Sequence, residues 1–222
     1  SDYHYDNSMG IISKRRDQAK ITQSIYTGIL DILMNDSIKD DKLDTFCEDA
    51  LEYFKQRCYD MIADKYPKDE FIISKTLKGE YSNRLGIAHA VLADRQAARD
   101  PGNAFSINDR VPYCYFFDNN FYSSKQKILQ GDRIETPEYI AKKGLPLDYV
   151  YYIEHQICEP VEQIFELLEY NSPGILQKFK DFIEQIKKQA KINCTRKDPR
   201  GNSILNYFSV SKIDARKRIK KN

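Results

Sequence analysis

The sequence predicts a mainly helical fold with a few short β-strands. Ile21, Ile25 and Ile29 lie four residues apart, a spacing that places them on one face of an amphipathic helix. Two runs rich in β-branched or aromatic residues, 71–77 and 111–117, are typical of strands instead. The helical pattern covers much more of the chain than the strand-like runs do.

The first half of the chain is expected to hold three helices. They cover about residues 21–34, 45–66 and 83–100, and each ends at residues that interrupt helices. The first two should pack as an antiparallel pair over one core. The strand at 111–117 contains Pro112, which indicates a sheet edge or a bulge.

The second half is expected to hold a polar stretch, further helices and a tail. Residues 121–144 are mixed and polar, so we expect a surface segment there. A long helix should start near Asp148, and Pro160 should kink it or split it. Another helix should end near Ala190, and residues 191–222 should form a flexible basic tail.

Composition and length are those of a soluble globular protein. The 222 residues can bury a real core, and 31% are charged against 41% hydrophobic. No apolar run approaches the roughly 18 residues that a membrane span needs, and no signal-peptide pattern opens the sequence. We therefore expect no membrane partner. The first residue is Ser1 rather than Met, so we expect an excised fragment.

Charge is spread unevenly. The net charge is +2, yet residues 196–222 hold nine Lys/Arg against two Asp. A basic tail on a mildly acidic body indicates a polyanionic partner, a disordered end or both.

The cysteines indicate a reducing, intracellular compartment. Their number is odd, they are widely spaced and no C-x-x-C occurs, which argues against a zinc site or a disulfide framework. The three histidines are isolated in sequence, so we expect structural roles rather than metal binding. The cysteines are Cys47, Cys58, Cys114, Cys158 and Cys194.

Basic residues gather at three points placed at turns or element ends. No nucleotide-binding loop, dinucleotide fingerprint or serine nucleophile motif is found in the sequence, so it does not read as a self-sufficient catalyst. Several cations on one face suit phosphate-backbone binding, although each of these residues could equally be solvated surface. The candidates are Lys14, Arg15 and Arg16; Lys75 with Thr76; and Arg95, Arg99 and Arg110.

Several of these segments resemble motifs of family B DNA polymerases. Residues 9–17 (MGIISKRRD) are similar to the K-G-[IVM]-x-x-x-R-R-D segment that joins palm to thumb, with Met9 in place of the frequent Lys. Residues 73–77 (ISKTL) resemble the [IV]-[ST]-[KR]-x-L thumb element, and 87–91 (IAHAV) resemble the H-V-x-x-A helix.

The resemblance continues in the family's order. Residues 99–102 (RDPG) and 108–113 (NDRVPY) resemble the R-D-P-G…G-D-R-V-P-Y signature of the delta-like branch, with Asn108 in place of Gly. Residues 145–157 resemble L-P-I-D…Y-Y-L-E-x-Q-[IL], and 160–165 the following P-[LV]-x-x-[IL]-F.

The resemblance implies a polymerase thumb that closes over a primer–template duplex. It implies the end of the palm and its junction at residues 1–17, the thumb at 18–190 and the tail at 191–222. The parent enzyme would add deoxynucleotides with two magnesium ions, but the family's palm motifs that hold them do not occur in this sequence. The palm of the same parent chain would be a partner, and the cations named above would contact DNA.

The tail carries a second hypothesis. Ile204, Tyr207 and Phe208 have the spacing of a sliding-clamp-binding peptide, although Gly201 stands where such peptides usually have Gln. The alternative is an apolar patch that docks on its own domain. The basic tail stands where cellular replicative enzymes of the family have a cysteine-rich module. This difference and the composition rich in Lys, Ile, Asn and Tyr favour an enzyme of a large DNA virus. Such an enzyme would work in the host nucleus or at a cytoplasmic replication site.

Two other readings stay open at this level. One is a stand-alone helical nucleic-acid-binding protein without a polymerase parent, which would bind duplex DNA tightly. The other is a helical protein-interaction scaffold, which would show no salt-dependent binding of DNA.

Overall fold

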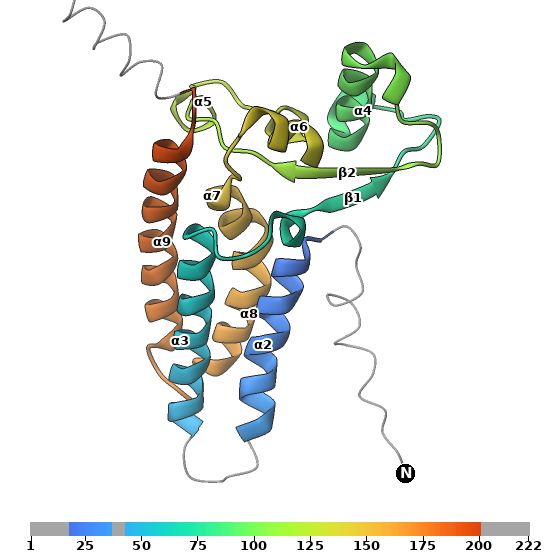
Figure 1. Cartoon of the computed structure of the whole chain (residues 1–222). Helices are drawn as coiled ribbons and strands as arrows, with labels where there is room; N and C mark the ends of the chain where they lie inside the picture. The colour runs from blue at the N-terminus through green and yellow to red at the C-terminus, as the bar shows by residue number, and fades with distance from the viewer. Residues whose placement is uncertain (1–17, 37–42, 201–222) are drawn as a thin grey trace, which may run out of the picture.

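The computed structural model describes residues 18–36 and 43–200. Helices dominate this part of the chain, and a three-stranded sheet accompanies them (Figure 1). The prediction of a mainly helical fold with a few short strands is confirmed.

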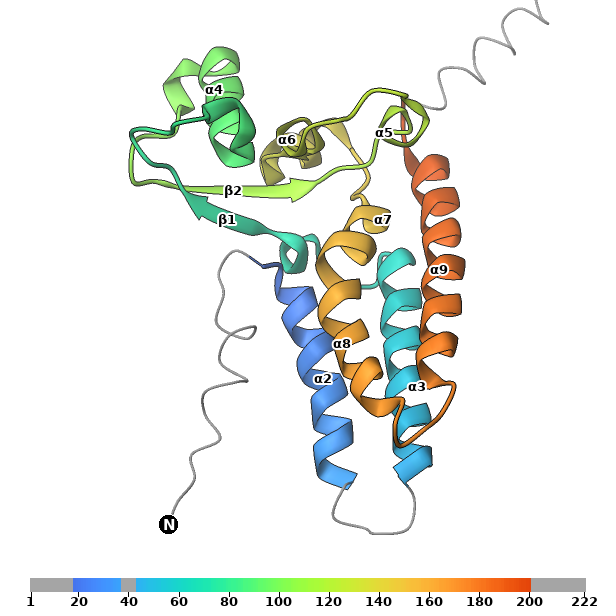
Figure 2. The ribbon, with the colours of Figure 1, turned by 180° about the vertical axis from the view of Figure 1, so that it is seen from behind.

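Long helices form a bundle that supports the rest of the molecule. They lie side by side in both views (Figures 1 and 2). Ile21, Ile25 and Ile29 are fully buried, as their spacing predicts, because burying this stripe is what stabilises an amphipathic helix. The bundle helices are α2 (Lys20–Asp36), α3 (Leu43–Ile62), α8 (Cys158–Leu168) and α9 (Ile175–Lys197).

Aromatic rings fill the seam between α3 and α9. Phe54 is fully buried, with its ring centroid 5.3 Å from that of Phe179 and 5.8 Å from that of Phe182. Phe165 of α8 stacks on Phe179 at 5.0 Å and joins the third helix to this cluster. The cluster therefore fastens α3, α8 and α9 together.

A π-helical turn precedes Pro160. Helix α7 (Tyr149–Tyr152) leads directly into π-helix η5 (Ile153–Ile157), and α8 follows at Cys158. Proline lacks a backbone N–H, so it fits the first turn of a helix but kinks or breaks a helix in its interior. The π turn ends the preceding helical register, so Pro160 lies in the first turn of α8, and the sequence-based expectation of an interruption is confirmed.

The sheet lies across one end of the bundle (Figure 1). Strands β1 (Ile73–Thr76) and β2 (Arg110–Tyr115) form an antiparallel ribbon, and β3 (Ile134–Glu135) pairs with the end of β2. Pro112 lies where β2 pairs with β1 but not with β3, which fits its expected position at an edge.

Helix α4 (Ala88–Arg99) lies over the ribbon, and several short elements complete the part of the molecule around the sheet (Figure 1). The expectation of a mere surface segment at 121–144 is wrong, because Ile134, Glu135 and Ile140 are buried there. The short elements are 3-10 helices η1 (Lys68–Phe71), η2 (Arg84–Gly86), η3 (Pro101–Asn103) and η4 (Gln130–Arg133), with α5 (Asn120–Ser123) and α6 (Pro137–Lys143).

The last helix runs further than its sequence pattern indicated. Helix α9 continues past the expected end at Ala190 to Lys197, because Cys194 extends the buried stripe and is 1% exposed. Arg200 then donates hydrogen bonds to the carboxylates of Asp198 and Asp118 at 2.9 and 2.8 Å. The expected tail at 191–222 is therefore ordered as far as residue 200, and its remainder lies outside the described residues.

All five cysteines lie in the described part of the chain, and none of them is bonded to another in a disulfide. This agrees with the expectation that they form no disulfide framework. Within residues 18–36 and 43–200, we find no helix with the length and apolar character of a membrane span.

Candidate nucleic-acid interface

The exposed end of the β1–β2 ribbon brings one arginine together with two hydroxyl groups. Thr76 is paired with Arg110 and Ser74 with Pro112, so Ser74, Thr76 and Arg110 share a face of the ribbon. The guanidinium of Arg110 donates to Ser74 Oγ at 2.8 Å and to Thr76 Oγ1 at 3.2 Å. It also donates to the Ser74 carbonyl at 2.6 Å, so its direction is fixed. Arg110 and Thr76 are both exposed.

A turn at residues 106–109, in which the Asp109 N–H donates to the Ser106 carbonyl, leads into β2 at Arg110 and is bonded to the end of β1. The Leu77 N–H donates to the Asp109 carbonyl, and the Asn108 N–H donates to the Leu77 carbonyl, each at 2.8 Å. Asn108 has a φ of 72°, a left-handed conformation that Gly and Asn adopt most readily. The Asn that replaces the family's usual Gly therefore suits the turn.

A buried histidine ties α4 to this end of the ribbon. His89 Nε2 lies 3.1 Å from the Thr76 carbonyl oxygen and 3.0 Å from the Tyr81 hydroxyl. Burial lowers the pKa of His89, opposed by the hydrogen bond to Thr76, and the charges of Lys75 and Arg110 lower it further. The neutral imidazole therefore links helix α4 to strand β1.

Lys75 lies on the opposite face of the ribbon from Arg110. Its partner across the ribbon is Val111, which is fully buried, and Lys75 itself is half-buried. The predicted pair of Lys75 and Thr76 is therefore divided between two faces, as successive residues of a strand must be.

The side chains of Arg95 and Arg99 contact η4 and β3, next to α4, rather than the end of the ribbon. Arg95 donates to the carbonyls of Gly131 and Ile134 at 2.9 and 2.7 Å. Arg99 donates to both carboxylate oxygens of Glu135 at 3.3 and 3.1 Å. The structure thus joins Arg95 and Arg99 to Glu135, which the sequence did not single out, and it places Arg110 in a separate set of contacts.

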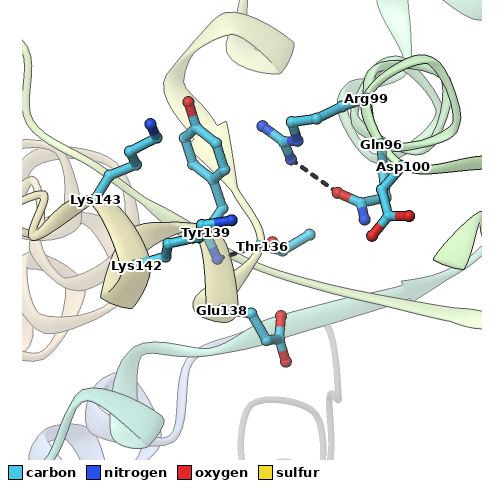
Figure 3. Close-up of a pocket in the computed structure, with 8 residues that line it drawn as sticks. All are labelled: Gln96, Arg99, Asp100, Thr136, Glu138, Tyr139, Lys142 and Lys143. Carbon is cyan, nitrogen blue, oxygen red and sulfur yellow. Dashed lines mark hydrogen bonds between the residues drawn. The ribbon is translucent and has the colours of Figure 1, made fainter.

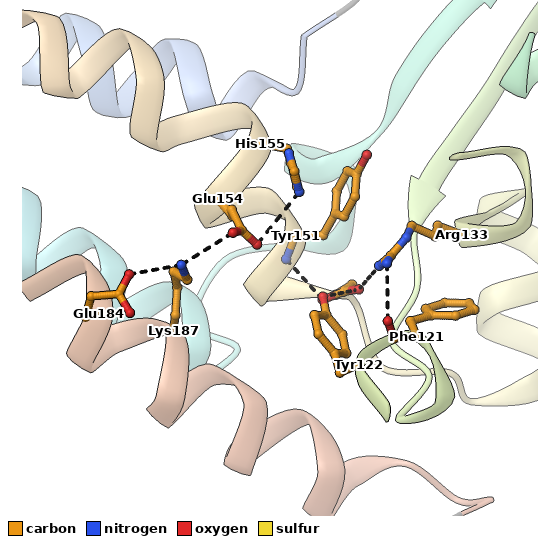
Figure 4. Close-up of polar contacts among 9 residues, drawn as sticks. Phe121, Tyr122, Arg133, Tyr151, Glu154, His155, Glu184 and Lys187 are labelled. Atoms are coloured by element: carbon orange, nitrogen blue, oxygen red, sulfur yellow. Dashed lines mark hydrogen bonds and ion pairs between the residues drawn. The ribbon is translucent and has the colours of Figure 1, made fainter. Parts of the chain in front are cut away.

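A second polar cluster links α5, η4 and α7 (Figure 4). Asp148 is fully buried and accepts hydrogen bonds from the Tyr122 hydroxyl at 2.7 Å and the Tyr151 N–H at 3.1 Å. Arg133 Nη1 lies 3.9 Å from Asp148 Oδ2, a weak ion pair. Burial raises the pKa of Asp148 to about 6, while the bond from Tyr122 and the charge of Arg133 oppose the shift.

The raised pKa of Asp148 predicts a stability that falls as pH increases. Between about pH 4 and 6, the unfolded chain releases this proton while the folded chain keeps it, so the free energy of unfolding decreases, by about 3 kcal/mol at most. Asp148→Asn keeps an N-cap and removes the titration. Urea unfolding at several pH values should show this decrease in the wild type relative to Asp148→Asn.

The matched control is Asp132→Asn, which changes an exposed aspartate of η4. Its free energy of unfolding should follow that of the wild type across the same pH range. An Asp148→Asn variant with an unchanged pH profile would show that the carboxylate is already ionised below pH 4.

The other predicted contact residues lie outside the described part of the chain. Those at the expected palm junction are Lys14, Arg15 and Arg16, and those of the clamp-like peptide are Ile204, Tyr207 and Phe208. Their roles stay predictions.

Within residues 18–36 and 43–200, no three His, Cys, Asp or Glu side chains are grouped as a metal ion would need. These residues therefore do not fit the two magnesium ions that the family resemblance implies, and we derive no metal-dependent step from them.

The fold is that of part of a polymerase. The structure superimposes with a TM-score of 0.52 and 19% identity on the family B DNA polymerase of the archaeon Pyrobaculum calidifontis, covering 68% of this chain and 18% of that one. The sequence model of "DNA polymerase family B" matches residues 2–168.

Sequence relatives agree with this class. The chain is 43% identical over 198 residues to the DNA polymerase of Acanthamoeba polyphaga mimivirus, and 37% identical over 166 residues to that of Pyramimonas orientalis virus. These alignments cover 88% and 75% of this chain but only 11% and 13% of the relatives. The DNA polymerase delta catalytic subunit of Candida albicans is 29% identical over 163 residues, which are 72% of this chain and 14% of that one.

The chain belongs to DNA polymerase family B. It spans about a tenth of the length of the mimivirus relative. The family resemblance drawn from the sequence motifs is thereby confirmed.

Proposed function

We propose that this chain is the thumb region of a replicative, template-directed DNA polymerase and that it grips the primer–template duplex by its phosphates. Membership of the family and the short span relative to the viral polymerases support a role as one segment of a larger enzyme. The parent would transfer deoxynucleotides inside the cell, with two magnesium ions bound by residues of the palm.

One observation carries the gripping role. Arg110 is exposed, its guanidinium is fixed by Ser74, and the Thr76 hydroxyl lies beside it at the end of a ribbon that projects beyond the bundle (Figure 1). A guanidinium and hydroxyl groups bind phosphate oxygens without reading base edges. A surface of this kind suits a duplex that must move during synthesis.

The remaining predicted residues extend this proposal. Lys75 would contact the phosphate backbone from the other face of the ribbon. Arg95 and Arg99 would hold η4 and β3 against α4. Lys14, Arg15 and Arg16 would lie where thumb meets palm, and Ile204, Tyr207 and Phe208 would bind a sliding clamp.

Salt dependence tests the proposal. The full-length protein that contains this chain should bind unrelated primer–template sequences with similar affinities, and each affinity should fall steeply with salt. Fluorescence anisotropy with several labelled duplexes between 50 and 200 mM salt, roughly, measures both quantities. Strong preference for one sequence, or affinity independent of salt, would contradict a grip on the backbone.

A further inference from the structure

A cleft of about 470 Å³ lies between the C-terminal half of α4 and the short helix α6 (Figure 3). Three of the side chains that line it are cationic, namely those of Arg99, Lys142 and Lys143. Both lysines are exposed, and both belong to the last turn of α6. The other lining residues are Gln96, Asp100, Thr136, Glu138 and Tyr139.

Arg99 is a fixed cation at one wall of the cleft. Its guanidinium donates to both oxygens of Glu135 and to Gln96 Oε1, the last at 2.8 Å. It also lies 3.8 Å from the centre of the Tyr139 ring, so its plane is held from a second side. These contacts reduce the conformational freedom that Arg99 would lose on binding an anion.

The lysines approach the same tyrosine from α6. Lys143 Nζ lies 5.9 Å from the centre of the Tyr139 ring, and in Figure 3 the ring stands between Arg99 and Lys143. Gly144 follows in a left-handed conformation, with φ of 62°, and ends the helix there. The turn therefore holds the backbone of both lysines while their long side chains keep their freedom.

Acidic groups around the cleft compensate only part of this charge. Glu135 is 7% exposed and is shared between Arg95 and Arg99, so the two arginines keep one net positive charge. Asp100 accepts a hydrogen bond from Asn103, and in Figure 3 the carboxylates of Asp100 and Glu138 point away from Tyr139. Three cations therefore face two carboxylates in the lining of the cleft, and the carboxylates are turned away from the tyrosine.

We propose that this cleft binds a phosphate group at the edge of the Tyr139 ring through Arg99, Lys142 and Lys143. The inference rests on the proposed function for one source of the phosphate, the backbone of the bound DNA; free pyrophosphate, a product of nucleotide transfer, has the same chemistry. Because the Tyr139 ring stands between Arg99 and Lys143, the long, exposed lysine side chains would reach past the ring edge to a phosphate that the planar guanidinium binds. Lys142 and Lys143 belong to none of the sequence motifs discussed above.

The test compares the double variant Lys142→Ala/Lys143→Ala with wild type in the full-length protein. In one arm, binding of labelled primer–template DNA is measured against salt, and the slope of log affinity on log salt should fall by about one to two units. In the other, inorganic pyrophosphate is titrated in EDTA by calorimetry, and its affinity should fall about tenfold.

Two further variants separate charge from structure. Lys142→Arg/Lys143→Arg keeps both charges and should retain wild-type behaviour in each arm. Lys180→Ala/Lys188→Ala removes two exposed lysines from α9 and should also leave both arms unchanged. Normal unfolding of the alanine variant would show that α6 remains folded.

Each outcome decides the inference. A change in the DNA arm assigns the cleft to the backbone, and a change in the pyrophosphate arm alone assigns it to the free anion. No change in either arm overturns the inference, even when Arg110→Glu weakens DNA binding. If wild type itself shows no salt-dependent DNA binding, the proposed grip fails, while the pyrophosphate arm still tests the cleft.

Discussion

Reversing the charge of Arg110 is expected to weaken binding of primer–template DNA by roughly 10- to 100-fold in the full-length protein. The variant Arg110→Glu removes a guanidinium that Ser74 and Thr76 hold at the exposed ribbon end. It also places a carboxylate where a phosphate would lie. The slope of log affinity on log salt should decrease by about one unit or more, because a phosphate contact is lost.

Two controls accompany this variant. Arg110→Lys keeps the charge but loses the planar fork, so it should retain most of the salt dependence with a smaller loss of affinity. Lys188→Glu reverses a charge on the exposed face of α9 and should change little. If Arg110→Glu binds DNA as tightly as wild type at each salt concentration, the ribbon end is not part of the grip.

Truncating Phe54 is expected to destabilise the chain by about 3–5 kcal/mol. Its ring is fully buried among Phe179 and Phe182, so Phe54→Ala opens a cavity where α3 meets α9. Urea unfolding followed by far-ultraviolet circular dichroism measures the change, and the chain contains no tryptophan that would report by fluorescence.

The matched control is Tyr59→Ala on the same helix. Tyr59 also contacts Phe182, but it is 40% exposed, so its loss should cost much less. Equal costs for the two variants would mean that the seam between α3 and α9 relaxes to fill the cavity.

The bundle could be predicted from the sequence because its signals are local. Ile21, Ile25 and Ile29 identify their own buried face by spacing alone, and Asp148 identifies a helix start by its type. The sequence predicts too early an end for α9, because only Cys194 continues its buried stripe beyond Ala190. A cysteine packs as a small hydrophobe, so its spacing from Ala190 held the missing signal.

The contacts of Arg95 and Arg99 could not be predicted because their partners are distant in sequence. Gly131, Ile134 and Glu135 lie 36 or more residues further on, in a stretch that looked polar and superficial. A buried glutamate has no local signature, and nothing in the order of residues shows that two arginines will share it. The sequence predicts only part of the Arg110 group, because it points to Thr76 but not to Ser74.

The most direct test of the proposed grip is a structure of the full-length protein bound to primer–template DNA. The proposal expects the ribbon end to lie against the duplex, with Arg110 nitrogens within about 3 Å of a phosphate oxygen. It also expects no hydrogen bonds from Arg110, Thr76 or Ser74 to base edges. A complex in which these residues face solvent or another part of the protein, with the duplex held elsewhere, would contradict it.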